Sequence, residues 1–151
     1  MVWFQILNKI KPLMTAIENQ KLTFRSVAEN IALVESLVDN ICEEFKINED
    51  NYGNILVAVT EAVTNAIQHG NKYDPKKNVE VIVKTKENLL RFVIHDEGSG
   101  FDFENLPDPT DPENIEKPHG RGIFLMQHLA DNVNFKENGR VVELNIKVCA
   151  N

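Results

Sequence analysis

Apolar residues recur every three or four positions in two long segments of the chain, which is the spacing of an amphipathic helix. The first helix is predicted to begin at Ser26, where Glu29 completes a capping-box pattern, and to run to about residue 45. Its apolar positions are Val27, Ile31, Val34, Val38, Ile41 and Phe45. The second helix is predicted to begin at Asn48 or Asp50 and to stop at Gly70, because glycine often ends a helix in a left-handed conformation.

Five shorter segments are rich in β-branched and apolar residues and predict strands: residues 21–25, 79–85, 89–95, 133–136 and 141–148. The second and third form a hairpin, and so do the last two, around a turn at Asn138 and Gly139. These elements predict one α+β domain that spans residues 21–148. Residues 1–20 form an N-terminal extension whose role the pattern does not indicate.

A long polar segment separates the two hairpins. Residues 102–118 carry four prolines among acidic residues and asparagines, and a further helix follows from Ile123. A structureless stretch of this length inside a compact domain is usually a functional lid or disordered.

Composition excludes several classes of protein. The formal net charge is -7, and Lys and Arg are dispersed, which argues against a nucleic-acid surface. No apolar run approaches the ~20 residues of a membrane span, and no signal peptide is recognisable. The two cysteines, Cys42 and Cys149, suit neither a zinc site nor a disulfide scaffold, so a cytoplasmic protein is expected.

Three polar residues of the second helix recur every four positions: Glu61, Asn65 and His69. At about 100° per residue this spacing places them on one face of the helix. Such a stripe is most often a solvated surface, so the pattern by itself leaves both interpretations open.

Two glycine-rich segments lie downstream of this helix. Asp96, Gly98 and Gly100 follow the strand at residues 89–95; they form either a simple turn or a site where the backbone approaches a flat ligand and the carboxylate accepts its hydrogen bond. Gly120 and Gly122 open the third helix, where free N–H groups bind anions. No Lys-Ser or Lys-Thr follows these glycines, so this is not a P-loop.

The order of these three segments resembles the GHKL ATPase superfamily, and within it the short bacterial anti-sigma factors that are also serine-protein kinases. The resemblance covers residues 21–148, and residues 61–69 and 120–126 carry it most strongly. It implies the Bergerat fold of histidine-kinase-like ATPases. This fold is an α+β two-layer sandwich with a mixed, mostly antiparallel sheet, helices on one face and an ATP lid, here residues 102–118.

The resemblance also implies roles for residues around ATP and Mg²⁺. Asn65 would ligate Mg²⁺, and Glu61 would be the general base that takes a proton from a serine hydroxyl or water. Asp96 would accept the exocyclic amino group of adenine. Gly98 and Gly100 would let the base and ribose lie against the backbone.

The third segment would hold the phosphates. Gly120 and Gly122 would line them with N–H groups, and Arg121 would neutralise charge on the γ-phosphate in the transition state. His69 is expected to support the helix end rather than bind metal, and His95, His119 and His128 to be structural or exposed.

One position departs from the family pattern. Relatives often have Thr after the glycine of the last hairpin, where it helps to hold adenine, but Arg140 and Val141 follow Gly139 here. If no nearby hydroxyl replaces it, weaker nucleotide affinity is expected.

The resemblance implies a protein-serine kinase that phosphorylates a small anti-sigma-factor antagonist, a STAS domain, and otherwise sequesters a sigma factor, commonly as a homodimer. An alternative is a nucleotide-dependent protein-binding module without significant catalysis. A third is the catalytic half of a sensor histidine kinase, which ranks below these because residues 1–20 are too short for a helical hairpin carrying a phospho-accepting histidine.

Overall fold

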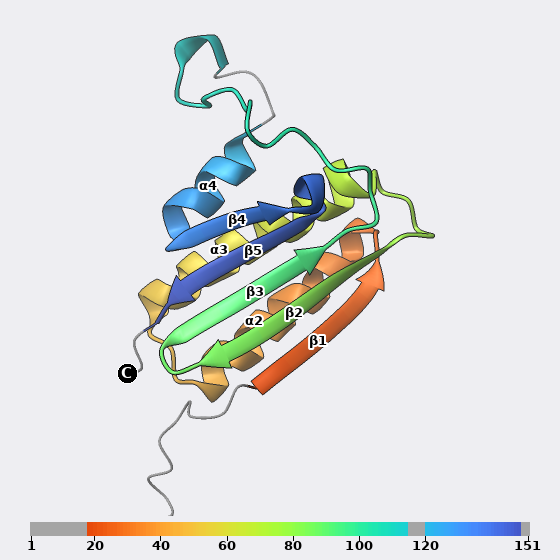
Figure 1. Ribbon diagram of the computed structural model, residues 1–151. Helices are drawn as coiled ribbons and strands as arrows, with labels where there is room; N and C mark the ends of the chain where they lie inside the picture. Colours follow the sequence, from red (N-terminus) through yellow and green to blue (C-terminus); the bar gives the residue numbers. More distant parts are fainter. Residues whose placement is uncertain (1–17, 115–119, 149–151) are drawn as a thin grey trace, which may run out of the picture.

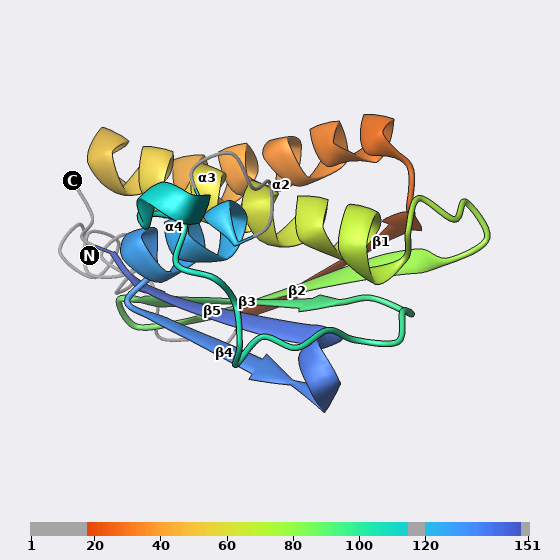
Figure 2. The same cartoon turned by 90° about the horizontal axis from the view of Figure 1, so that it is seen from above.

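The computed structural model describes residues 18–114 and 120–148. These residues form two layers, an antiparallel sheet and a set of helices that lie on one of its faces (Figures 1 and 2). The predicted α+β sandwich with helices on one face is confirmed. Most of the N-terminal extension, the end of the lid segment and His119 lie outside the described residues.

The sheet contains β1 (Glu18–Arg25), β2 (Asn78–Lys86), β3 (Leu89–His95), β4 (Asn132–Lys136) and β5 (Val141–Lys147). Their order across the sheet is β1-β2-β3-β5-β4. All five strands and both hairpins were predicted, although β1 begins three residues earlier than expected. Every pairing among these strands is antiparallel, in agreement with the mostly antiparallel sheet that was expected, although no parallel pair occurs among the described strands.

The first long helix begins later than predicted. A short 3-10 turn, η1 (Ala28–Asn30), precedes α2 (Ile31–Glu44), and no side chain caps either element. The predicted capping box at Ser26 is therefore wrong. Ser26 is fully buried, and its hydroxyl donates to the carbonyl oxygen of Lys77 at 3.0 Å. A buried hydroxyl needs a partner, and here a distant loop provides it rather than the adjacent helix.

The second long helix, α3 (Glu49–Asn65), has the predicted cap at Asn48, whose side chain accepts from the N–H of Asn51 at 2.8 Å. It continues into a π-helical turn, η2 (Ala66–Gly70), closed by a hydrogen bond from the N–H of Asn71 to the carbonyl of Ala66 at 2.8 Å. The helical segment ends at Gly70 as predicted, but Gly70 is not among the glycines with positive φ. A glycine is needed at this position because a Cβ atom there would overlap the carboxyl group of Asp96.

The remaining helix, α4 (Arg121–Leu129), packs beside α3 (Figure 1). Two further 3-10 turns are η3 (Pro112–Asn114), within the lid segment, and η4 (Glu137–Gly139), within the predicted turn of the last hairpin. No helix in the described ranges combines the length and the apolar character that crossing a membrane requires.

The core lies between the sheet and the helices. Side chains of β2 and β3 alternate between buried and partly exposed, as expected for a sheet with one covered face. The largest fully buried side chains come from both layers: Phe92, Ile41, Ile55, Ile67, Leu90, Ile94, Met126 and Leu144.

The face of the sheet away from the helices carries a charged network centred on Glu143. Its carboxylate contacts Lys136 Nζ at 2.9 Å and Arg91 Nε at 3.6 Å. Arg91 Nε also donates to the side-chain oxygen of Asn145 at 2.8 Å. The hydrogen bonds from Lys136 and Asn145 and the charge of Arg91 lower the pKa of Glu143. This network ties three adjacent strands together on the solvent side.

We predict that Glu143→Gln lowers the free energy of unfolding at pH 7 by about 1 kcal/mol, a modest loss because solvent screens Lys136 and Arg91. Folding lowers the pKa of Glu143, so its contribution is fully present above the ordinary value of 4.5 and is lost as the pH falls through the lower folded value. Urea unfolding between pH 7 and pH 3 measures the difference.

Glu137→Gln serves as the control. The Glu137 side chain is well exposed, and its Oε2 makes one long ion pair, 3.8 Å from Arg140 Nη2. It is expected to change stability far less. A Glu143→Gln protein that matches wild type at pH 7 would contradict a stabilising role for the network.

Candidate active site

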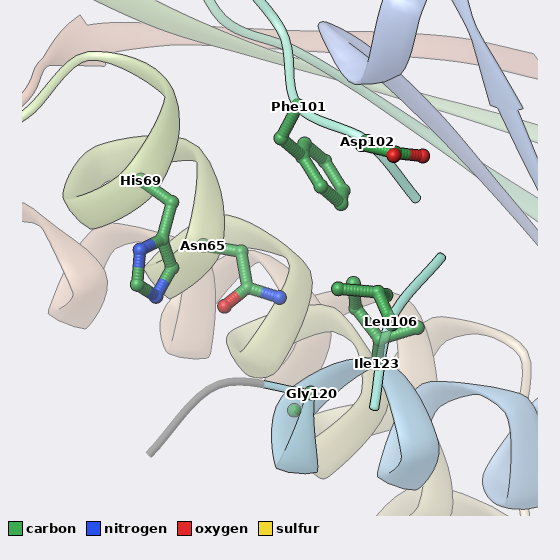
Figure 3. A pocket seen from close by; sticks show the side chains of 8 residues that line it. Asn65, His69, Phe101, Asp102, Leu106, Gly120 and Ile123 are labelled. Carbon is green, nitrogen blue, oxygen red and sulfur yellow. The ribbon is translucent and has the colours of Figure 1, made fainter. Parts of the chain in front are cut away.

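A cavity of about 210 Å³ lies between the end of α3, the segment after β3 and the start of α4. Asn65 and His69 form one wall, Phe101 faces them from the segment after β3, and the first turn of α4 borders the opposite side (Figure 3). Three predicted site residues, Asn65, Gly120 and Gly122, line this cavity together with His69, Phe101, Asp102, Leu106 and Ile123.

The first turn of α4 lies directly against the polar stripe of α3. A Cβ atom added to Gly122 would lie 2.7 Å from Glu61 Oε2 and 3.3 Å from Asn65 Nδ2. Glu61 and Asn65 are both partly buried there. The structure therefore brings together three predicted residues from two distant segments, and glycine is what allows the close approach. Asn65 and His69 of the stripe line the cavity, whereas Glu61, which lies against Gly122, is not among the lining residues.

The start of α4 offers backbone donors to the same cavity. Gly120 is the N-cap, with a positive φ of 94°, and it makes no side-chain capping bond. Within residues 18–114 and 120–148, no side chain accepts from the N–H groups of the first turn, and such groups favour an anion. Arg121, the first residue of α4, is exposed and is not among the residues that line the cavity.

Asp96 lies at the other end of the site, where it lines a second, small cavity of about 10 Å³. Asn65 and Phe101 border both cavities, so the two are adjacent. Burial raises the pKa of the half-buried Asp96 carboxyl group. The N–H of Gly98 donates a hydrogen bond to Asp96 Oδ1 at 2.8 Å, and this bond lowers the same pKa. This bond occupies Oδ1, and in the described part of the chain no hydrogen bond is seen to the second carboxylate oxygen, Oδ2.

The backbone around Asp96 is packed so closely that side chains are excluded. A Cβ on Gly70 would overlap the Asp96 carboxyl group, and a Cβ on Gly98 would overlap the carbonyl of Gly70. Gly100 has a φ of 83°, and a Cβ there would overlap the carbonyl of Asn138. These glycines are required by contacts within the protein, in addition to any role toward a ligand.

Several cavity residues were not identified from the sequence. His69 is exposed and lines the cavity beside Asn65, and its expected role in supporting the helix end stays a prediction. Phe101 packs edge-on against Phe135, with ring centroids 5.6 Å apart, and Phe103 stacks on Phe135 at 4.9 Å. The sequence feature that could have identified Phe101 and Phe103 is their apolar character within an otherwise polar segment.

The structure bears on the position after Gly139, where this chain has Arg140 in place of the Thr that relatives often have. No Ser or Thr is among the residues that line the two cavities in the described part of the chain. Arg140 is exposed, and its carbonyl oxygen accepts the N–H of Asp96 at 3.0 Å. No hydroxyl therefore replaces the missing Thr at these two cavities, and weaker nucleotide affinity stays a prediction.

The side chains of the candidate site suit Mg²⁺ only if the phosphates of a bound nucleotide supply further oxygen ligands. Within residues 18–114 and 120–148, no group of three or more His, Cys, Asp or Glu is placed to hold a metal ion. Mg²⁺ often takes one or two protein oxygens and completes its shell with phosphate oxygens and waters. The amide of Asn65 on the cavity wall fits that requirement.

Comparison with known proteins gives consistent results. The histidine kinase-like ATPase domain family matches residues 24–146. A Staphylococcus aureus protein named serine-protein kinase RsbW is 32% identical over 127 residues, covering 78% of this chain and 79% of the relative. A protein of the same name from Bacillus anthracis is 27% identical over 127 residues, covering 80% and 79%.

A solved structure of the RsbU and RsbW domains of a Mycobacterium tuberculosis protein matches with a TM-score of 0.57 and 12% sequence identity. The match covers 87% of this chain and 32% of the other, so this chain spans about a third of that protein's length. At this identity the likeness shows the fold. Because the family match extends over residues 24–146, from the first strand to the last, the chain belongs to the histidine kinase-like ATPase domain family and has its Bergerat fold.

Proposed function

We propose that this chain is a protein-serine kinase that transfers the γ-phosphoryl group of ATP to a serine hydroxyl of a small STAS-type antagonist protein. One observation carries the proposal: Asn65 and the first turn of α4 line one cavity, and the Glu61 carboxylate lies directly against Gly122 in that turn. Relatives that match over about 79% of their own length are named serine-protein kinases.

Glu61 is proposed as the general base. Its carboxylate lies beside Gly122, next to the phosphate-binding end of α4, where an incoming serine hydroxyl would need to lose its proton. The hydroxyl oxygen then bonds to the γ-phosphorus as the bond from that phosphorus to the β–γ bridging oxygen breaks, and ADP leaves. The proton passes from the hydroxyl to the Glu61 carboxylate.

Asn65 and α4 are proposed to hold the phosphates. The Asn65 side-chain oxygen would ligate Mg²⁺, which neutralises charge on the phosphates when it is bound. The N–H groups at Gly120 and Gly122 would donate to phosphate oxygens. Arg121, exposed at the first position of α4, would stabilise the γ-phosphoryl charge during transfer.

Asp96 is proposed to select adenine by accepting its exocyclic amino group, with Gly98 and Gly100 keeping the backbone next to the base. The cavity beside Asp96 measures only about 10 Å³. A purine ring needs far more room, so the side chains that line this cavity, Phe101 among them, would need to rearrange when the base reaches Asp96.

The partners form the second half of the proposal. The resemblance of residues 61–69 and 120–126 to anti-sigma-factor kinases supports a partner switch in which this chain, as a homodimer, sequesters a sigma factor until the antagonist engages it. Incubation with ATP, Mg²⁺ and candidate antagonist proteins, followed by phosphoserine detection, tests the catalytic half. ATP binding without transfer to any antagonist would favour a binding module.

Glu61→Gln is expected to lower the rate of phosphotransfer by about 100-fold or more, the usual contribution of a general base, and to leave ATP affinity within about two-fold of wild type. Single-turnover transfer and calorimetric ATP binding measure the two effects. Glu35→Gln, which changes an exposed carboxylate on α2, should alter neither. An unchanged rate in Glu61→Gln would remove Glu61 from the base role.

Gly122→Ala tests the contact between α4 and α3. Alanine is tolerated within a helix, but its Cβ would displace the Glu61 carboxylate, so a fall in transfer rate of about ten-fold or more is expected while the fold persists. Gly53→Ala on α3 is the matched control, because a Cβ there would meet open space beyond its own stretch of helix backbone. The control should transfer at the wild-type rate and gain up to about 1 kcal/mol of stability.

Asp96→Asn is expected to weaken ATP binding by about ten-fold or more, since the charged acceptor of the amino group is lost. Asn keeps an oxygen for the N–H of Gly98. Because folding raises the pKa of Asp96 through burial, the charged carboxylate disfavours the folded state at neutral pH, and the variant should be as stable as wild type or more stable there.

The effect of Asp96→Asn on stability is expected to depend on pH. Any stability gained by Asp96→Asn should be present above the raised folded pKa and should disappear as the pH falls below the ordinary value of 3.8, where both states are protonated. Calorimetry with ATP at pH 7 and urea unfolding from pH 7 to pH 3 provide the measurements. Full ATP affinity in the variant would show that Asp96 does not read the base.

A further inference from the structure

Asn71 is the most buried polar side chain near the site apart from Ser26, and it lines neither cavity. It follows η2 directly and is only 1% exposed. A buried amide costs free energy unless its donors and its acceptor are all paired, so such a residue is expected to hold specific partners.

All polar atoms of the Asn71 side chain are paired. Its Nδ2 donates to Ser26 Oγ at 2.6 Å and to the carbonyl of Asn78 at 2.9 Å. Its Oδ1 accepts the backbone N–H of Glu97 at 2.7 Å. One side chain therefore connects the end of the helical segment, the loop before α2, the start of β2 and the segment after β3.

The Glu97 bond lies next to Asp96 in the chain. On the other side, the N–H of Asp96 donates to the carbonyl of Arg140 at 3.0 Å, and the N–H of Gly98 donates to the Asp96 carboxylate at 2.8 Å. The Glu97 side chain, in turn, accepts the N–H of Asn78. Of these bonds, only the one from Glu97 to Asn71 ties the backbone just after Asp96 to the helical segment that carries Glu61 and Asn65.

We propose that Asn71 is a positioning residue for nucleobase selection: its amide sets the orientation of Asp96 relative to α3 by holding the N–H of Glu97. The inference rests on the proposed function, because it takes Asp96 to be the group that reads adenine. Asn71 itself touches neither cavity and acts through the backbone.

The chemistry of the amide explains why this position needs a side chain with both a donor and an acceptor. One end must accept from the N–H of Glu97 while the other donates to the carbonyl of Asn78. An apolar side chain can do neither, and a carboxylate cannot donate. The backbone of Asn71 is held independently by its bond to Ala66, so its own place in the fold does not depend on the side chain alone.

Asn71→Ala is the principal test, with calorimetric binding of ATP and of GTP to the full chain. ATP affinity is expected to fall about ten-fold, the effect of losing one buried positioning bond, while the weak GTP affinity changes less than two-fold. The ratio of the two affinities therefore falls about ten-fold. A merely structural role would leave this ratio unchanged in the folded fraction, because both nucleotides would lose the same share of competent protein.

Ser26→Ala is the matched control. It removes a fully buried hydroxyl that bonds the same amide, but Asn71 keeps its bonds to Asn78 and Glu97. It is expected to lower stability and to leave the ATP-to-GTP ratio within two-fold of wild type. Equal loss of the ratio in Ser26→Ala would overturn the proposal, and so would an unchanged ratio in folded Asn71→Ala.

A second measurement uses the wild-type protein and does not depend on any variant folding. Without nucleotide, the backbone N–H of Glu97 should exchange with deuterium at least ten-fold more slowly than that of the exposed Ser99 nearby. Free exchange at Glu97 would overturn the proposal. A wild-type protein that binds neither nucleotide would instead refute the proposed function, while the Glu97 exchange rate would still report on the Asn71 bond.

Discussion

The close approach of η2 to the segment after β3 is the contact on which the site depends. No side chain fits at Gly70, because the Asp96 carboxyl group fills that space, and none fits at Gly98, because the carbonyl of Gly70 is there. This contact puts the carboxylate that follows the end of β3 directly beside the end of the helical segment. The distance between the two ends of the candidate nucleotide site is set by backbone packing, which is stiffer than contacts between long side chains.

A second glycine contact completes the arrangement from the other direction. Gly122 lets α4 lie against Glu61 and Asn65, so the first turn of α4 and Asn65 border one cavity with the Glu61 carboxylate directly beside that turn. α4 thereby combines two functions: Met126 and Ile123 bury its apolar side in the core, and its first turn offers donors to an anion. The same packing that stabilises the domain assembles the site.

Local patterns predicted the elements well because one covered sheet face and amphipathic helices impose simple periods. The Asn48 cap, the two hairpins and the start of α4 near Gly120 all follow from short-range chemistry. Where prediction failed, a tertiary contact had replaced a local one. Ser26 matched a capping box, but its hydroxyl bonds Lys77, which lies 51 residues away.

Gly70 and Asn71 show the same limit at the site. A glycine at a helix end suggests a left-handed turn, and an asparagine after it suggests a solvated loop. Both residues serve contacts with Asp96 and Glu97, about 26 positions later in the chain, and no periodicity in the sequence records such a pairing.

The sequence by itself determined the element types and the α+β fold, and it predicted the chemical groups of the candidate site, from Glu61 and Asn65 to Asp96 and the glycines around Arg121. These follow from side-chain periodicity and from the family resemblance of three short segments. Only the tertiary structure decided which groups meet. Gly122 packs against the Glu61 carboxylate, and the Asn71 side chain accepts the N–H of Glu97. His69 and Phe101 line the cavity, whereas Arg121 is exposed. The reason is that residue spacing specifies a face of one helix or strand, whereas the partner of that face is chosen by packing between distant segments.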